Sequence, residues 1–154
     1  MPAFPPLPAP FDTTAPTLVD PSGTMRVWLT DPPGMLDQAA VGARFSTELA
    51  RWLTQDASAA MTAAYPADAR YAFVHDWRGI ATYTTEARLD IIGWGRKLGM
   101  KHIERIDIVL APDAGTFFRM AVQGGALAMT VIGVKCAVAA SVDAALASSP
   151  LAPR

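Results

Sequence analysis

The stretch that decides the fold is residues 71–110, YAFVHDWRGIATYTTEARLDIIGWGRKLGMKHIERIDIVL. It opens on Tyr71–His75, a nearly continuous apolar run that ends at Asp76 and is typical of a strand buried on both faces. Thr84 is placed to cap a helix that ends near Gly99. Apolar residues then alternate over 103–110, which indicates a second strand. A helix of this length between two strands predicts that they pair in parallel.

Moving toward the N-terminus, the sequence predicts a hairpin and a helix. The turn DPSG at 20–23 has proline second and glycine fourth, as in a type I turn, and it separates residues 17–20 from an alternating strand over 24–29. The segment 31–34 (DPPG) ends that strand. Apolar residues then recur near the helical period, which predicts a helix from about 35 to 54. Residues 55–69 are expected to form a short helix or a loop.

Toward the C-terminus, Pro112–Asp113 is expected to open a helix that stops at Gly133. A strand over 134–139 and a short helix over 142–147 follow. The order β-β-α-β-α-β-α-β-α predicts an α/β fold with a single open, mixed, mostly parallel sheet of about five strands and four helices.

Composition divides the chain into three parts. Nine of the thirteen prolines lie in residues 1–33, which predicts a proline-rich arm over 1–16, followed by the α/β domain over 17–148 and a C-terminal tail over 149–154. Proline favours extended geometry, so Phe4, Leu7 and Phe11 are available to dock. We expect a docking arm that is not part of the core.

Charge and cysteine content exclude several classes of function. The chain is 51% hydrophobic and 18% charged, so it is too apolar for disorder. Its net charge of -1 provides no field that attracts nucleic acid. A lone Cys136 excludes an internal disulfide and a thiolate zinc cage, and neither a metal nor a cofactor is expected.

Residues 120–140 are apolar enough to be considered as a membrane span, but they contain Gln123 and Lys135. A buried helix followed by a buried strand explains the window better, and a cytoplasmic location is expected.

Four segments carry a resemblance to a known family: YAFVHDWRGI, TTEARLDIIGWGRKLGM, IERIDIVLAPDAGTFFRM and GVKCAVAASVDAAL. From residue 71 to residue 146 the chain resembles the STAS domain, the fold of bacterial anti-sigma-factor antagonists. The likeness extends to the SpoIIAA-like, lipid-binding branch related to CRAL-TRIO domains. Its motifs are mostly apolar patterns that many α/β folds share.

The resemblance implies a candidate phospho-switch, or its remnant, at Thr84, Thr85 and Glu86. Antagonist-type STAS domains have a phosphorylatable serine in an Asp-Ser-Ser-Gly type motif where this helix begins. Here the aspartate and glycine are missing, and Glu86 falls at or beside the acceptor position. We expect the site to be fixed in one state, with the threonines serving as helix caps.

A second candidate site lies where the central strand meets the next loop, the edge at which open α/β sheets bind ligands. It comprises His75, Asp76, Trp77 and Arg78, with Tyr83 and Arg88 on the same edge or the adjoining helix. Either Arg88 or Arg78 could bind an anion there, with the aromatic rings as an apolar wall. The alternative is that these residues serve only the fold. Because His75 and Asp76 are neighbours on a strand, they start on opposite faces and form no catalytic pair.

These observations favour a non-enzymatic, STAS-like protein-interaction domain, regulatory or scaffolding, that also self-associates as a homo-oligomer. The alternative is a SpoIIAA-like binder of a hydrophobic ligand or a membrane surface, with an enzyme third. The two leading hypotheses differ in where Trp28, Trp77 and Tyr83 point. An outward patch favours a protein partner, and an inward arrangement around a cavity favours a ligand.

Overall fold

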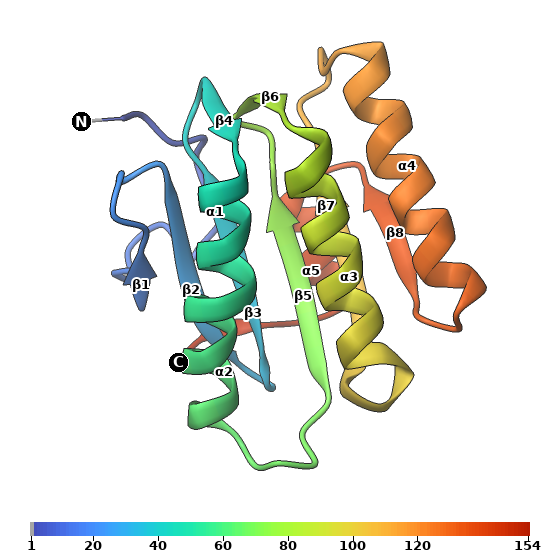
Figure 1. Cartoon of the computed structure of the whole chain (residues 1–154). Coiled ribbons are helices and arrows are strands. Elements are labelled where there is room, and N and C mark those ends of the chain that lie inside the picture. The colour runs from blue at the N-terminus through green and yellow to red at the C-terminus, as the bar shows by residue number, and fades with distance from the viewer. Residues whose placement is uncertain (1) are drawn as a thin grey trace.

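A computed structural model describes residues 2–154 as a mixed sheet with helices on both faces (Figure 1). Within these residues the main sheet has seven strands, in the order β1-β2-β3-β5-β7-β8 with β9 beside β2. Strands β3, β5, β7 and β8 are parallel, whereas β1, β2 and β9 pair antiparallel. The predicted α/β class is therefore confirmed, although the sheet has more strands than the five or so expected.

The strands of the main sheet are β1 (Leu18–Val19), β2 (Met25–Asp31), β3 (Gly34–Ala39), β5 (Tyr71–Asp76), β7 (Ile103–Val109), β8 (Cys136–Ala139) and β9 (Ala152–Pro153). Two short strands, β4 (Ala43–Phe45) and β6 (Ile80–Tyr83), form a separate parallel pair. The helices are α1 (Thr47–Arg51), continued by a π-helical segment (Trp52–Ala57) and α2 (Ser58–Ala64), then α3 (Thr85–His102), α4 (Thr116–Val131) and α5 (Val142–Ser148).

The predictions around the decisive stretch are confirmed. Strand β5 is buried along its whole length between β3 and β7. The Thr84 hydroxyl caps α3 by accepting a hydrogen bond from the Ala87 amide at 3.1 Å. At Gly99 the backbone of α3 becomes non-helical, with φ of 58°. The hairpin turn over 20–23 also forms, because Leu18 and Val19 pair with Val27 and Arg26.

The helix predicted from 35 to 54 is wrong in its first half. Residues 34–39 form β3, every residue of which is buried between β2 and β5, and the helix begins only at Thr47. A strand buried on both faces lacks the alternation by which strands are recognised. Gly34 opens β3 with φ of 156°, and a Cβ there would lie 1.9 Å from the Ala72 carbonyl oxygen. Neither β3 nor the short β6 was predicted.

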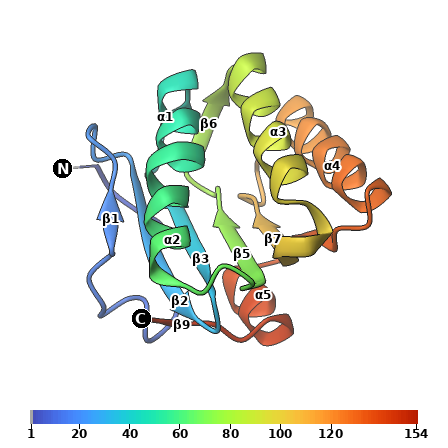
Figure 2. The ribbon, with the colours of Figure 1, turned by 60° about the horizontal axis from the view of Figure 1, so that its bottom comes forward.

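The sheet separates two apolar cores. Helices α1, α2, α3 and α4 cover one face, whereas α5 and the N-terminal arm cover the other (Figures 1 and 2). Strand residues alternate between the two cores; on β2, for example, Val27 faces the larger core and Trp28 the smaller. We call these two sides the helical face and the arm face.

The expectation that the arm lies outside the core is wrong. Leu7 and Phe11 are buried in the core of the arm face, where the Phe11 ring meets Trp28 edge-on with centroids 6.0 Å apart. Trp28 is 1% exposed because the arm covers it, and its Nε1 donates to the Thr14 carbonyl oxygen at 2.9 Å. The tail also joins the sheet, since residues 152–153 pair with β2.

Among the described residues, no helix combines the length and apolar character that crossing a membrane requires. The apolar window 120–140 is split between the end of α4 at Val131 and strand β8, as the sequence predicted, but β8 is only half-buried and Leu127 and Val131 of α4 are exposed.

Candidate functional site

The predicted edge residues are divided between the two faces of the sheet. His75 and Trp77 turn to the helical face, whereas Asp76 turns to the arm face and holds Arg78 there. This division follows from the alternation of side chains along β5 and confirms that His75 and Asp76 form no pair. The structure therefore contains two polar clusters in place of the single edge predicted from the sequence.

On the helical face, Asp37 of β3 lies beside His75 in the parallel register. One carboxylate oxygen of Asp37, Oδ2, pairs with Nδ1 of His75, and the other, Oδ1, accepts a hydrogen bond from Nε1 of Trp77 at 3.0 Å. The Asp37 and His75 side chains are 0% and 3% exposed. A buried carboxylate is retained only when its oxygens are partnered, which these two donors achieve.

Aromatic packing fixes the orientation of the His75 ring. It stacks between Phe73 and Trp77, with ring centroids 5.9 Å and 5.1 Å away. Since these side chains are neighbours on one strand and its extension, β5 builds the stack alone and Asp37 holds it from the adjacent strand. Sequence reasoning missed Asp37 because it placed this residue in a helix; the signal was a carboxylate inside the apolar run MLDQAA at 35–40.

Beside this pair lies a cavity of about 70 Å³ bounded by the sheet, α3 and α4. Nearly all its walls are apolar. It is lined from the β strands and loops by Phe45, Phe73, His75, Trp77, Tyr83, Ile103, Ile106, Ile108 and Cys136, from α3 by Arg88, Ile91, Ile92, Trp94 and Gly95, and from α4 by Phe118, Ala121, Val122, Gly125, Ala126 and Met129. The predicted site residues His75, Trp77, Tyr83 and Arg88 are thus brought together.

The second ring nitrogen of His75, Nε2, opens toward this cavity. No hydrogen-bond partner for Nε2 lies within residues 2–154. Every fully enclosed side-chain nitrogen or oxygen in that part of the chain has a partner, so Nε2 is not enclosed. Since His75 lines the cavity, the cavity is the space that Nε2 reaches. The site therefore presents Nε2 of His75 to a largely apolar cavity.

Tyr83 and Arg88 extend the lining toward the surface. The Tyr83 ring packs on Phe118 with centroids 5.3 Å apart, which joins β6 to α4 across the cavity. Arg88, on the first turns of α3, lines the cavity and is exposed to solvent. Arg88 thus places a positive charge at the exposed part of the cavity lining, above its apolar walls. This arrangement agrees with the predicted pocket edge.

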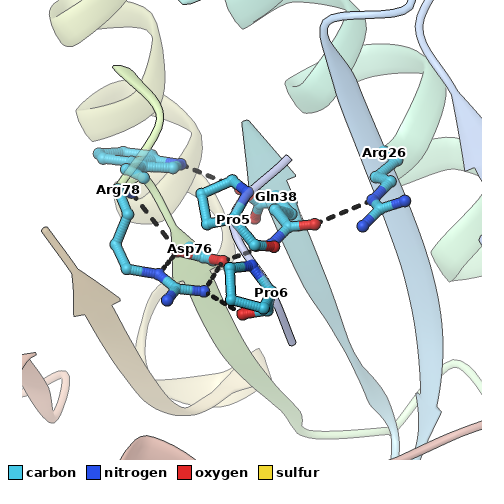
Figure 3. A network of polar contacts seen from close by, with 8 residues as sticks. Pro5, Pro6, Arg26, Gln38, Asp76 and Arg78 are labelled. Atoms are coloured by element: carbon cyan, nitrogen blue, oxygen red, sulfur yellow. Dashed lines mark hydrogen bonds and ion pairs between the residues drawn. The ribbon is translucent and has the colours of Figure 1, made fainter. Parts of the chain in front are cut away.

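On the arm face, Asp76 organises the second cluster (Figure 3). Arg78 binds both Asp76 oxygens, with Nε at 2.7 Å and Nη2 at 2.8 Å, and Gln38 donates to the same carboxylate at 2.7 Å. The hydrogen bonds that Arg78 donates to Asp76 raise the pKa of Arg78, whereas burial lowers the pKa of Arg26, whose Nε donates to Gln38. Arg78 is therefore engaged by Asp76 and is not part of the cavity.

The same cluster holds the arm in place. Arg78 donates to the Pro6 carbonyl oxygen and Gln38 to the Pro5 carbonyl oxygen, both at 2.8 Å. Arg26 lies over the Phe4 ring, 4.1 Å from its centroid. A bidentate, charge-assisted pair is among the stronger polar contacts, and here it turns the end of β5 into an anchor for a segment seventy residues away in sequence.

The helix start at Thr84 is built as a cap. Thr84 is half-buried and its amide donates to the Phe45 carbonyl oxygen at 3.1 Å, while Thr85 and Glu86 are exposed. Phosphorylation of either threonine, and a fixed state maintained by Glu86, stay predictions.

Cys136 lines the cavity, but its thiol is not activated. Burial raises the pKa of this thiol from 9.0 to about 12, so it stays protonated at neutral pH. Among residues 2–154, no group of three or more His, Cys, Asp or Glu side chains could hold a metal ion.

Comparison with known proteins adds no relative. No family model matches the chain, and no curated protein or solved structure matches it significantly. The resemblance to STAS domains therefore stays a prediction, and the functional argument depends on the geometry of the cavity.

Proposed function

We propose that this domain binds a small hydrophobic molecule in the cavity between α3, α4 and the sheet. The observation that carries the proposal is the position of the aromatic residues. Trp77 and Tyr83 line the cavity, and Trp28 is covered by the arm, so the three form no outward patch. Binding sites for small molecules are mostly apolar with a few directed polar groups, which describes this lining.

The cavity volume limits the ligand to a compact molecule. About 70 Å³ is roughly half the volume of an engineered apolar cavity that holds benzene. Met129 provides room for adjustment: a Cβ at Gly95 would lie 2.7 Å from its Cε, so the Met129 tip occupies the space above that glycine. Methionine side chains change rotamer easily. A single ring or a short branched chain is therefore the largest ligand that we propose.

Toluene is a suitable first probe. A ligand that binds only the folded state stabilises it, by about 2.7 kcal/mol at a hundred times its Kd. We expect toluene to raise the melting temperature of the wild type, and Ala126→Leu, which fills the cavity from α4, to abolish the rise. Ala128→Leu on the same helix is the control, because Ala128 does not line the cavity.

The control should respond as the wild type does. A wild type without a response to toluene, or an Ala126→Leu variant that responds fully, would overturn ligand binding in this cavity.

A second function, self-association, is favoured by the outer face of α4. Phe117, Met120, Leu127 and Val131 are 85%, 61%, 65% and 78% exposed. Together with Gly124 they are spaced 3, 4, 3 and 4 residues apart, the pattern of an apolar seam on one side of a helix. The seam is nearly symmetric about Gly124, where a Cβ would meet nothing within 4 Å. We call these five residues the α4 seam.

We propose that the partner on the α4 seam is a second copy of this chain. An antiparallel pair related by a two-fold axis at Gly124 places Phe117 against Val131 of the other copy, so one stripe complements itself. At roughly 150 Å² for a large apolar side chain, the seam offers about 900 Å² to a pair, near the ~1,000 Å² that specific interfaces need. Such a dimer agrees with the protein-interaction role that the STAS resemblance implies.

Sedimentation velocity tests this interface. We expect a dimer at tens of micromolar protein, and a monomer after Leu127→Glu, which places a charge in the seam. Val19→Glu is the control, since Val19 is 52% exposed on β1, at the opposite edge of the sheet. A wild-type monomer at that concentration, or an unchanged dimer in Leu127→Glu, would refute the interface.

A further inference from the structure

The hydrogen bonds around Asp37 determine which nitrogen of His75 carries a proton. An ionised carboxylate only accepts hydrogen bonds, and an indole N–H only donates. Trp77 therefore supplies the donor at Oδ1, and Nδ1 of His75 must supply the donor at Oδ2. In a neutral imidazole a proton on Nδ1 leaves Nε2 as an acceptor. Asp37 and Trp77 thus make Nε2 of His75 a hydrogen-bond acceptor.

Among the described residues, Nε2 of His75 has no hydrogen-bond partner in the largely apolar cavity. The His75 side chain is 3% exposed, and no group within residues 2–154 donates to Nε2, which opens toward the cavity. Phe73, Ile106 and Ile108, which line the cavity from β5 and β7, carry no group that can donate a hydrogen bond. An occupant that covers Nε2 without donating to it would bury this polar atom with no partner, which is unfavourable.

We infer that the ligand of this cavity carries a hydroxyl group that donates a hydrogen bond to His75 Nε2. This inference rests on the proposed ligand-binding function and adds the polar half of the ligand. The class of ligand is then a small phenol or a compact alcohol, with its apolar body against α3 and α4. His75 selects for the hydroxyl, and Asp37 is the positioning residue that sets the tautomer.

Phenol and toluene test the inference directly, because they differ mainly by a hydroxyl group in place of a methyl group. One net hydrogen bond changes affinity by roughly tenfold. We expect phenol to bind the wild type about tenfold more tightly than toluene, after correction for their different solubility in water. Calorimetry at pH 8 measures both affinities. His75→Phe keeps the aromatic stack but removes the acceptor, so it should lose this preference.

The Asp37→Asn variant provides a signature that a merely structural role would not produce. Trp77 still donates to Oδ1, so the new amide presents its NH₂ group to Nδ1 of His75. Nδ1 then becomes the acceptor, and Nε2 carries the proton. The variant should prefer benzaldehyde, which only accepts hydrogen bonds, over phenol. Asp107→Asn is the control, since this buried carboxylate pairs with Arg105 and does not touch His75.

Each outcome decides between the two proposals. If the wild type binds toluene and phenol equally, the hydroxyl inference is refuted while ligand binding stands. If it binds neither, both are refuted. A wild type that binds benzoate more tightly than phenol would show that the His75 ring is protonated and donates from Nε2. That result also refutes the assignment of Nε2 as an acceptor. If Asp37→Asn does not fold, the wild type and His75→Phe still decide the question through their phenol-to-toluene ratios.

Discussion

Replacing Phe11 with alanine tests whether the proline-rich arm is part of the core. The side chain is 1% exposed and its ring meets Trp28 edge-on at 6.0 Å. Removing a buried phenylalanine side chain costs about 3–5 kcal/mol of unfolding free energy. We expect about 3 kcal/mol here, because Phe11 lies in a surface segment whose exposed neighbours can move to close part of the cavity. For a chain of this size that is a fall of roughly 6–12 °C in melting temperature.

Urea unfolding followed by tryptophan fluorescence measures this loss, since the Trp28 ring packs edge-on against that of Phe11. Phe4→Ala is the matched control on the same arm. Phe4 is half-buried and packs under the Arg26 guanidinium, an interaction worth about 0.5–1 kcal/mol. The slope of unfolding free energy against urea should stay that of the wild type. If Phe11→Ala lies within about 0.5 kcal/mol of the wild type, the arm does not contribute to the core.

Three further changes test other parts of the structure. Thr84→Ala should lower the unfolding free energy by about 0.5–2 kcal/mol through loss of the α3 cap, whereas Thr85→Ala should leave it nearly unchanged; equal losses in chemical denaturation would contradict the assignment of the cap. Gly34→Ala should cost more than about 3 kcal/mol or prevent folding, because its Cβ would meet the Ala72 carbonyl oxygen at 1.9 Å, and a stable, wild-type-like variant in thermal melts would disprove the β3–β5 contact. Burial raises the pKa of Cys136 to about 12, so the folded state holds this proton more tightly and its stabilising effect, complete below pH 9.0, is lost as pH rises toward 12. Cys136→Ser should flatten that alkaline loss in denaturation measured from pH 8 to pH 11, and identical profiles would show that the thiol is not buried.

Local sequence patterns were sufficient to predict a helix or strand wherever the residues of that element determine its conformation by themselves. The Thr84 cap, the break at Gly99 and the apolar run at 71–75 are features of a few consecutive residues that the sequence located correctly, although α3 resumes after Gly99 and ends at His102. The alternation of His75 and Asp76 between faces also follows from strand geometry alone. The parallel pairing of β5 with β7 followed from the length of the helix between them.

The parts of the fold that local patterns did not predict depend on contacts between segments that are distant in sequence. Residues 34–39 have apolar positions that suit a helix, yet they form β3 because β2 and β5 bury both of their sides at once. Phe11 looked like part of a free arm until Trp28, on a strand seventeen residues later, provided the surface that it covers. Tertiary structure overrides local preference in such places because burial on folding outweighs intrinsic propensities of about 1 kcal/mol.

The candidate site likewise combines residues that the sequence grouped together with a residue that only the tertiary structure placed beside them. The sequence determined that His75, Trp77, Tyr83 and Arg88 belong near one strand end, since they lie within fourteen residues of one another. Only the tertiary structure placed Asp37 beside His75, because parallel pairing of β3 and β5 brings together side chains 38 positions apart. The cavity exists for the same physical reason: α3 and α4 each pack on the sheet, and the space left between them depends on their packing and on no local run of residues.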